Sequence, residues 1–77
     1  MPVLSENREE NVLTFKISLV PILMKAWGKN TFEIAEIIEK YQILPYVDAC
    51  YEYFNTMGIK GVIEDIEDYI RVQGGSI

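Results

Sequence analysis

The stretch from residue 61 to residue 70, GVIEDIEDYI, most restricts the fold, because its apolar residues recur at the spacing of one helix face. The apolar positions are Val62, Ile63, Ile66, Tyr69 and Ile70. Four carboxylates fill the complementary arc: Glu64, Asp65, Glu67 and Asp68. This pattern is typical of an amphipathic helix whose aliphatic side packs inward and whose acids face water. Glu67 and Arg71 are expected to pair across one turn.

A second amphipathic helix is predicted in the segment NTFEIAEIIEKY, residues 30–41. Asn30 is a suitable N-cap, and Glu33 stands where a capping box requires a carboxylate. Gly28, just ahead, can end a preceding helix in a left-handed conformation. We expect the inward face of this helix to contain Phe32, Ala35, Ile38 and Tyr41, joined by Ile34 and Ile37.

A third helix is predicted in the segment QILPYVDACYEYFNTMG, residues 42–58. Pro45 suits the first helical turn, where its missing N–H is not needed. Gly58 is expected to close this helix, as Gly28 closes the first. The residues expected to face inward are Val47, Cys50, Tyr51, Phe54 and Met57. Cys50 is therefore predicted to be a buried structural cysteine.

Residues 12–20 fit two patterns. Leu13, Phe15, Ile17 and Leu19 alternate with polar residues, as in a half-buried strand. A strand here would suit a winged-helix-like regulator. Helical spacing instead places Val12, Phe15, Leu19, Ile22, Leu23 and Ala26 on one side. Two arguments favour the helix: the alternation ends after Val20, and the chain offers no second strand-like run to pair with a first.

The sequence therefore predicts an all-α fold, a small compact bundle of about four short helices. We expect the first helix to be kinked near Pro21, or split there into two short helices, because proline deletes a helical hydrogen bond. A chain of 77 residues suffices for one domain. The expected boundaries are a flexible arm at residues 1–9, a helical domain at residues 10–72 and a flexible tail at residues 73–77.

The charge balance excludes two classes of partner. The chain carries 7 basic and 12 acidic residues, with no basic run, for a net charge of −5. Nucleic-acid binding and docking on an anionic membrane both need clustered lysine and arginine, so neither is expected. The N-terminal segment lacks a signal-peptide pattern, and no apolar run is long enough to span a bilayer, so a cytoplasmic protein is the simplest interpretation.

The candidate chemistry is sparse, and we expect no catalytic residues, no metal and no cofactor. The chain has no histidine and a single cysteine, which leaves no base for a serine nucleophile and no cysteine–histidine zinc site. The alternative is a metal-binding or catalytic site built from Glu64, Asp65 and Asp68, since neighbouring carboxylates can bind hard cations or separate their pKa values.

The aromatic residues suggest a contact surface instead. Aromatics make up 12% of the chain, and five of them are tyrosines. Tyrosine and tryptophan are enriched at protein interfaces, and one small core cannot enclose them all. Trp27, Tyr46 and Tyr53 are the residues expected to form such a surface, although core and rim packing remains the more frequent role of such side chains.

The order of these segments resembles a family of small bacterial proteins, domain of unknown function 3791. The resemblance covers roughly residues 12–70, and Thr56 with Gly58 and the run Ile63–Ile66 carry its most specific part. It implies a small helical protein and does not imply an enzyme. Members often have Leu-His before the Thr-x-Gly turn, where this chain has Phe54-Asn55. A role of that histidine would be lost here.

We therefore expect a non-enzymatic protein–protein interaction module that binds a protein partner or self-associates. The resemblance also implies an antitoxin-like variant, because such proteins are associated with toxin-like neighbours; that variant predicts a basic partner.

Overall fold

The regular secondary structure of the described residues is entirely helical. The computed structural model describes residues 4–76, and it describes side chains from Arg8 onward. This range contains no strand, which confirms the all-α prediction and overturns the strand and winged-helix alternatives for residues 12–20. The helices are α1 (Leu4–Trp27), α2 (Thr31–Lys40), α3 (Ile43–Ala49), α4 (Tyr51–Phe54) and α5 (Ile59–Val72).

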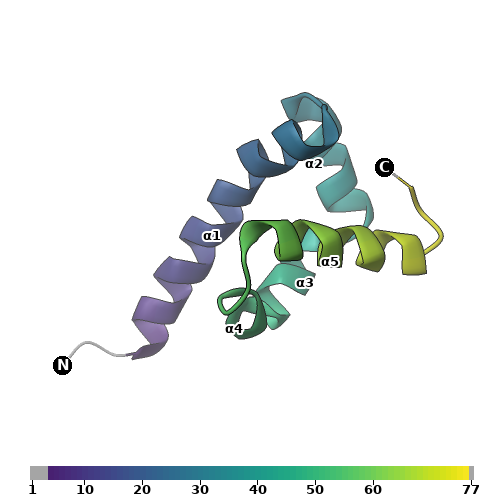
Figure 1. Cartoon of the computed structure of the whole chain (residues 1–77). Helices are drawn as coiled ribbons and strands as arrows, with labels where there is room; N and C mark the ends of the chain where they lie inside the picture. The colour runs from purple at the N-terminus through teal and green to yellow at the C-terminus, as the bar shows by residue number, and fades with distance from the viewer. Residues whose placement is uncertain (1–3, 77) are drawn as a thin grey trace.

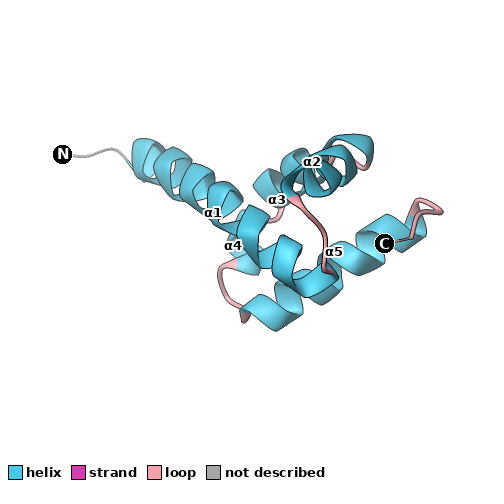
Figure 2. Cartoon of the chain, turned by 90° about the horizontal axis from the view of Figure 1, so that it is seen from above, coloured by secondary structure: helices cyan, strands magenta, loops and turns pink. Residues whose placement is uncertain are grey.

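The long helix α1 extends beyond the other four helices at its N-terminal end (Figure 1). α5 lies across α3, and the N-terminal end of α1 projects outward in a second view as well (Figure 2). The chain accordingly measures 44 × 23 × 21 Å along its principal axes.

Helix α1 starts earlier than expected and does not break. Residues 4–9, assigned by the sequence to a flexible arm, are helical, and residues 1–3 lie outside the described residues. Arg8 explains the early start, because its side chain forms ion pairs with Asp48 and Glu52. The helix also continues through Pro21, so the two-helix alternative is wrong. Pro21 and Ile17 are exposed, so water can reach the Ile17 carbonyl that proline leaves without a helical partner. The expected kink stays a prediction.

The junction between α1 and α2 follows the sequence signals closely. Gly28 adopts a left-handed φ of 64°, and the Lys29 amide donates to the Met24 carbonyl at 3.0 Å, which is the Schellman ending of a helix. Asn30 then caps α2. Its side-chain Oδ1 accepts a hydrogen bond from the backbone amide of Glu33 at 2.8 Å, and its backbone amide donates to Glu33 Oε1 at 3.0 Å. The predicted capping box is confirmed.

The predicted third helix is two short helices that meet at Cys50. Cys50 has φ −105° and ψ 12°, outside the regular helix between α3 and α4. Its side chain is half-buried against the core, less enclosed than predicted. Gly58 does not close this helix. It is extended, with φ −76° and ψ 167°, and it is the N-cap of α5. A hydrogen-bonded turn already ends α4, in which the Met57 amide donates to the Phe54 carbonyl at 3.1 Å.

The core lies where α1, α2, α3, α4 and α5 converge. The apolar face of α5 points into it as predicted: Val62, Ile66 and Ile70 are fully enclosed, and Ile63 and Tyr69 are half-buried. The other enclosed side chains include Leu19, Leu23, Ile34, Ile43, Val47 and Phe54.

The inward face of α2 differs from the prediction. Phe32 is 84% exposed and Ala35 is exposed, whereas Ile34 is completely buried. The buried stripe runs from Ile34 through the half-buried Ile37 and Ile38 to Tyr41, spaced three to four residues apart. Because one helix presents only one such stripe to a core on one side, residues 32 and 35 face outward.

The C-terminal segment folds back on α2. The Gln73 side-chain amide donates to the Tyr41 carbonyl at 3.3 Å, and the Gly75 amide donates to the Ile70 carbonyl at 3.0 Å. Gly75 lies so close to the Tyr41 ring that any side chain at this position would collide with it. Residues 73–76, expected to form a flexible tail, therefore cover one side of Tyr41.

Candidate functional site

The acidic face of α5 is divided among separate partners. Asp65 and Glu67 are half-buried, and each accepts a hydrogen bond from an aromatic side chain: Tyr46 Oη to Asp65 Oδ1 at 2.8 Å, and Trp27 Nε1 to Glu67 Oε2 at 2.9 Å. Asp68 pairs with Arg71, in place of the predicted Glu67–Arg71 pair. These acids therefore connect helices rather than converge on one point.

The alternative site of Glu64, Asp65 and Asp68 gains no support from this arrangement. Glu64 and Asp68 are exposed, and Asp65 is engaged by Tyr46. Among the residues that the structure describes, no three histidine, cysteine or acidic side chains are placed to share a metal ion. The prediction that all four acids of α5 face water is wrong for Asp65 and Glu67, which are half-buried.

The three aromatic residues predicted to form a contact surface have different environments. Tyr46 stacks on Tyr69 with ring centroids 3.9 Å apart and planes inclined by 7°. Burial, helped by the hydrogen bond to Asp65, raises the pKa of Tyr46 above its ordinary value. Trp27 is half-buried against the core, and only Tyr53 is largely exposed, at 60%. Much of the surface of Trp27 and Tyr46 is therefore covered by contacts within the chain.

A cluster of charged side chains ties α1 to α3 and α4. Arg8 contacts Glu52 through two nitrogens, with Nη2–Oε1 at 3.1 Å, and Lys16 Nζ lies 3.1 Å from Asp48 Oδ2. The Lys16 hydrogen bond lowers the pKa of Asp48, and the Arg8 hydrogen bond lowers the pKa of Glu52. Asp48 and Glu52 each have a basic partner and remain partly exposed. The cluster therefore joins α1 to α3 and α4 through ion pairs that occupy its charged groups.

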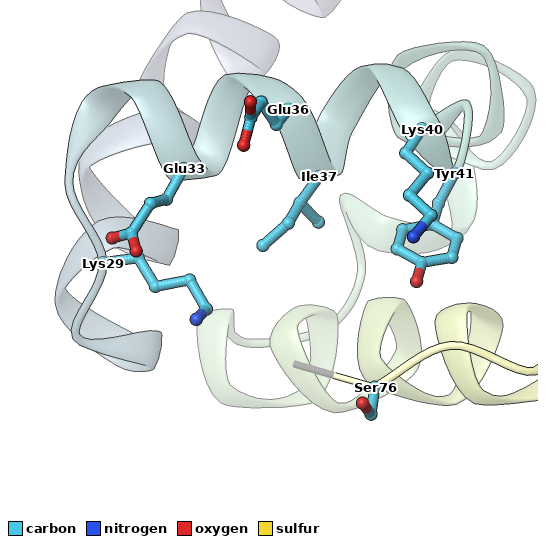
Figure 3. Close-up of a pocket in the computed structure, with 7 residues that line it drawn as sticks. All are labelled: Lys29, Glu33, Glu36, Ile37, Lys40, Tyr41 and Ser76. Carbon is cyan, nitrogen blue, oxygen red and sulfur yellow. The ribbon is translucent and has the colours of Figure 1, made fainter.

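A cleft of about 300 Å³ separates α2 from the C-terminal segment (Figure 3). Ile37 points into its middle, with Lys29 and Glu33 at one end, and Lys40 and Tyr41 at the other. The lining contains two lysines and two glutamates, and one glutamate oxygen already caps α2. Because these charges balance, the cleft favours neither an anion nor a cation. Its lining contains no histidine that could act as a general base.

The outer side of α1 carries an apolar surface that the sequence pattern had not assigned. Leu13 and Ile17 are 58% and 63% exposed, and the half-buried Val20 and Met24 continue the same line. We call these four residues the outer stripe. Their spacing of four, three and four residues places them on one side of the helix, about a third of a turn from the face that packs on the core. In the sequence, this surface shows only as the alternation of apolar residues over positions 12–20, which includes Leu13 and Ile17.

Comparison with known proteins gives a family and nothing closer. The comparisons with curated proteins and with solved structures gave no significant match. No helix in residues 4–76 has the combined length and hydropathy of a membrane-spanning segment. One family model, described as "Protein of unknown function (DUF3791)", matches residues 14–73, which is most of the chain and confirms the resemblance seen in the sequence. The chain belongs to this family.

Proposed function

We propose that this protein is a non-enzymatic protein–protein interaction module whose contact surface is the outer stripe of α1. The observation that carries the proposal is the exposure of Leu13 and Ile17, one turn apart, on the side of α1 that does not pack on the core. Contiguous exposed apolar side chains on a small protein typically mark a surface that a partner covers.

The surroundings of the outer stripe support this role. A recurrent mode of recognition lays an apolar helix face against another protein, with anchors three to four residues apart. The charged groups between α1, α3 and α4 already form ion pairs with one another, and the charges that line the cleft balance. Both features therefore offer less to a ligand than the outer stripe does. Of the aromatic residues predicted for a contact surface, Tyr53 is the most accessible for a secondary role.

Two variants of the full chain test the proposal. Ile17→Lys places a charge in the centre of the outer stripe, and Ser18→Lys places the same charge on an exposed neighbouring position outside it. We expect the wild-type chain and Ser18→Lys to form a complex, with a partner or with themselves, that Ile17→Lys loses. Size measurement and co-purification from the native host provide the readout.

A strictly monomeric wild-type chain with no co-purifying protein would contradict the proposal. A complex that Ile17→Lys and Ser18→Lys retain equally would place the contact elsewhere. The antitoxin-like variant adds a narrower prediction, namely that the co-purifying protein is basic.

A further inference from the structure

We infer that the occupant of the outer stripe is a second copy of this chain, with the two α1 helices packed antiparallel. This inference rests on the proposed function and specifies its partner. The stripe runs over residues 13, 17, 20 and 24, the alternating spacing of four and three at which helices pack side by side in a coiled coil. A two-fold axis between residues 18 and 19 then places Leu13 against Met24 and Ile17 against Val20 of the other copy.

Charge distinguishes the antiparallel arrangement from a parallel one. The exposed charges of α1 are acidic toward its N-terminus, at Glu9 and Glu10, and basic near its C-terminal end, at Lys25. In the antiparallel register, residues 9 and 10 of one copy come level with residues 28 and 27 of the other, within one helical turn of Lys25. A parallel pair would instead set acid against acid and lysine against lysine, which is unfavourable.

The fold leaves these charges available for such pairing. Arg8 and Lys16 form ion pairs with α3 and α4, whereas Glu10 and Lys25 form none with the described residues of their own chain. An antiparallel helix pair is also the isologous arrangement, in which each patch meets its own copy and the assembly closes as a dimer. Because the stripe covers only four positions, we expect a weak dimer that forms at micromolar concentrations.

Charge reversal tests the orientation. Glu10→Lys brings two basic ends together, and Lys25→Glu brings two acidic ends together. Because the two-fold axis repeats each effect, each single variant should raise the dimer Kd about 3- to 10-fold. The double variant, Glu10→Lys with Lys25→Glu, restores opposite charges and should return the Kd to near the wild-type value. Sedimentation equilibrium on the full-length chain measures all four proteins, with circular dichroism to verify that they keep their helix content.

The outcomes separate this inference from the proposed function. A dimer that Ile17→Lys weakens about 100-fold or more, and that the double charge variant restores, supports the antiparallel pair. A dimer that Ile17→Lys abolishes but the double variant fails to restore overturns the orientation. A monomeric wild-type chain overturns the homodimer, while a different protein lost specifically with Ile17→Lys would leave the proposed function standing.

Discussion

Removal of the Glu67 carboxylate should destabilise the fold, although the sequence presents this residue as one of four equivalent acids. Trp27 Nε1 donates to Glu67 Oε2 at 2.9 Å and thereby joins the end of α1 to α5. Glu64, on the same helix, is exposed and has no such partner among the described residues. Comparison of Glu67→Ala with Glu64→Ala therefore cancels the helix propensity of alanine and isolates the contact.

The expected size follows from the environment of the hydrogen bond. A hydrogen bond to a charged group contributes about 1.5–3 kcal/mol when enclosed, and half-burial of both partners reduces this to about 1 kcal/mol. For a domain of this size, 1 kcal/mol corresponds to a fall of about 4–8 °C in Tm. Glu64→Ala should change the free energy of unfolding by less than about 0.5 kcal/mol.

Urea unfolding followed by circular dichroism measures both variants, and Trp27→Phe completes a double-mutant cycle. Trp27→Phe keeps an aromatic ring but removes the indole N–H, so Glu67→Ala should cost less in that background. Equal stabilities of Glu67→Ala and Glu64→Ala, or a coupling energy of zero in the cycle, would refute the reasoning and return Glu67 to the solvated face that its sequence position suggests.

Three further perturbations test other parts of the fold. Ile66→Ala should lower the free energy of unfolding by about 2–5 kcal/mol, measured by urea titration, because the side chain is completely enclosed. Asn30→Ala should cost about 0.5–2 kcal/mol in the same assay, since it removes the cap that accepts from the Glu33 amide. Because Arg8 lowers the folded-state pKa of Glu52 below its ordinary 4.5, the unfolded chain binds more protons near that pH. Thermal melts should therefore show stability falling as the pH drops below about 4.5, and less steeply in Arg8→Gln.

The local signals in the sequence predict much of this fold. The capping box at Asn30 and the left-handed ending at Gly28 depend only on residues near in sequence, and both are present. The inward face of α5 follows from spacing alone, because Val62, Ile66 and Ile70 recur every four residues. Such features need no knowledge of the partner helix.

The features that depended on distant residues could not be predicted in the same way. The early start of α1 follows from Arg8 reaching Glu52, 44 residues along the chain. Similarly, Glu67 pairs with Trp27 across 40 residues rather than with Arg71 one turn away. In each case the contact is tertiary, and sequence spacing indicates only contacts between neighbouring residues. The prediction that Phe32 faces inward fails for a related reason, since helical spacing does not show on which side of the helix the core lies.

The ambiguity of residues 12–20 is itself explained by the structure. Leu13, Phe15, Ile17 and Leu19 alternate as in a strand, yet they belong to one helix with apolar residues on two sides. Phe15 and Leu19 pack toward the core, whereas Leu13 and Ile17 form the exposed half of the outer stripe. A helix that packed on a single core would need only one of these two sides. The apparent strand pattern is therefore the superposition of two helical stripes, and the second stripe is the surface that the proposed partner would cover.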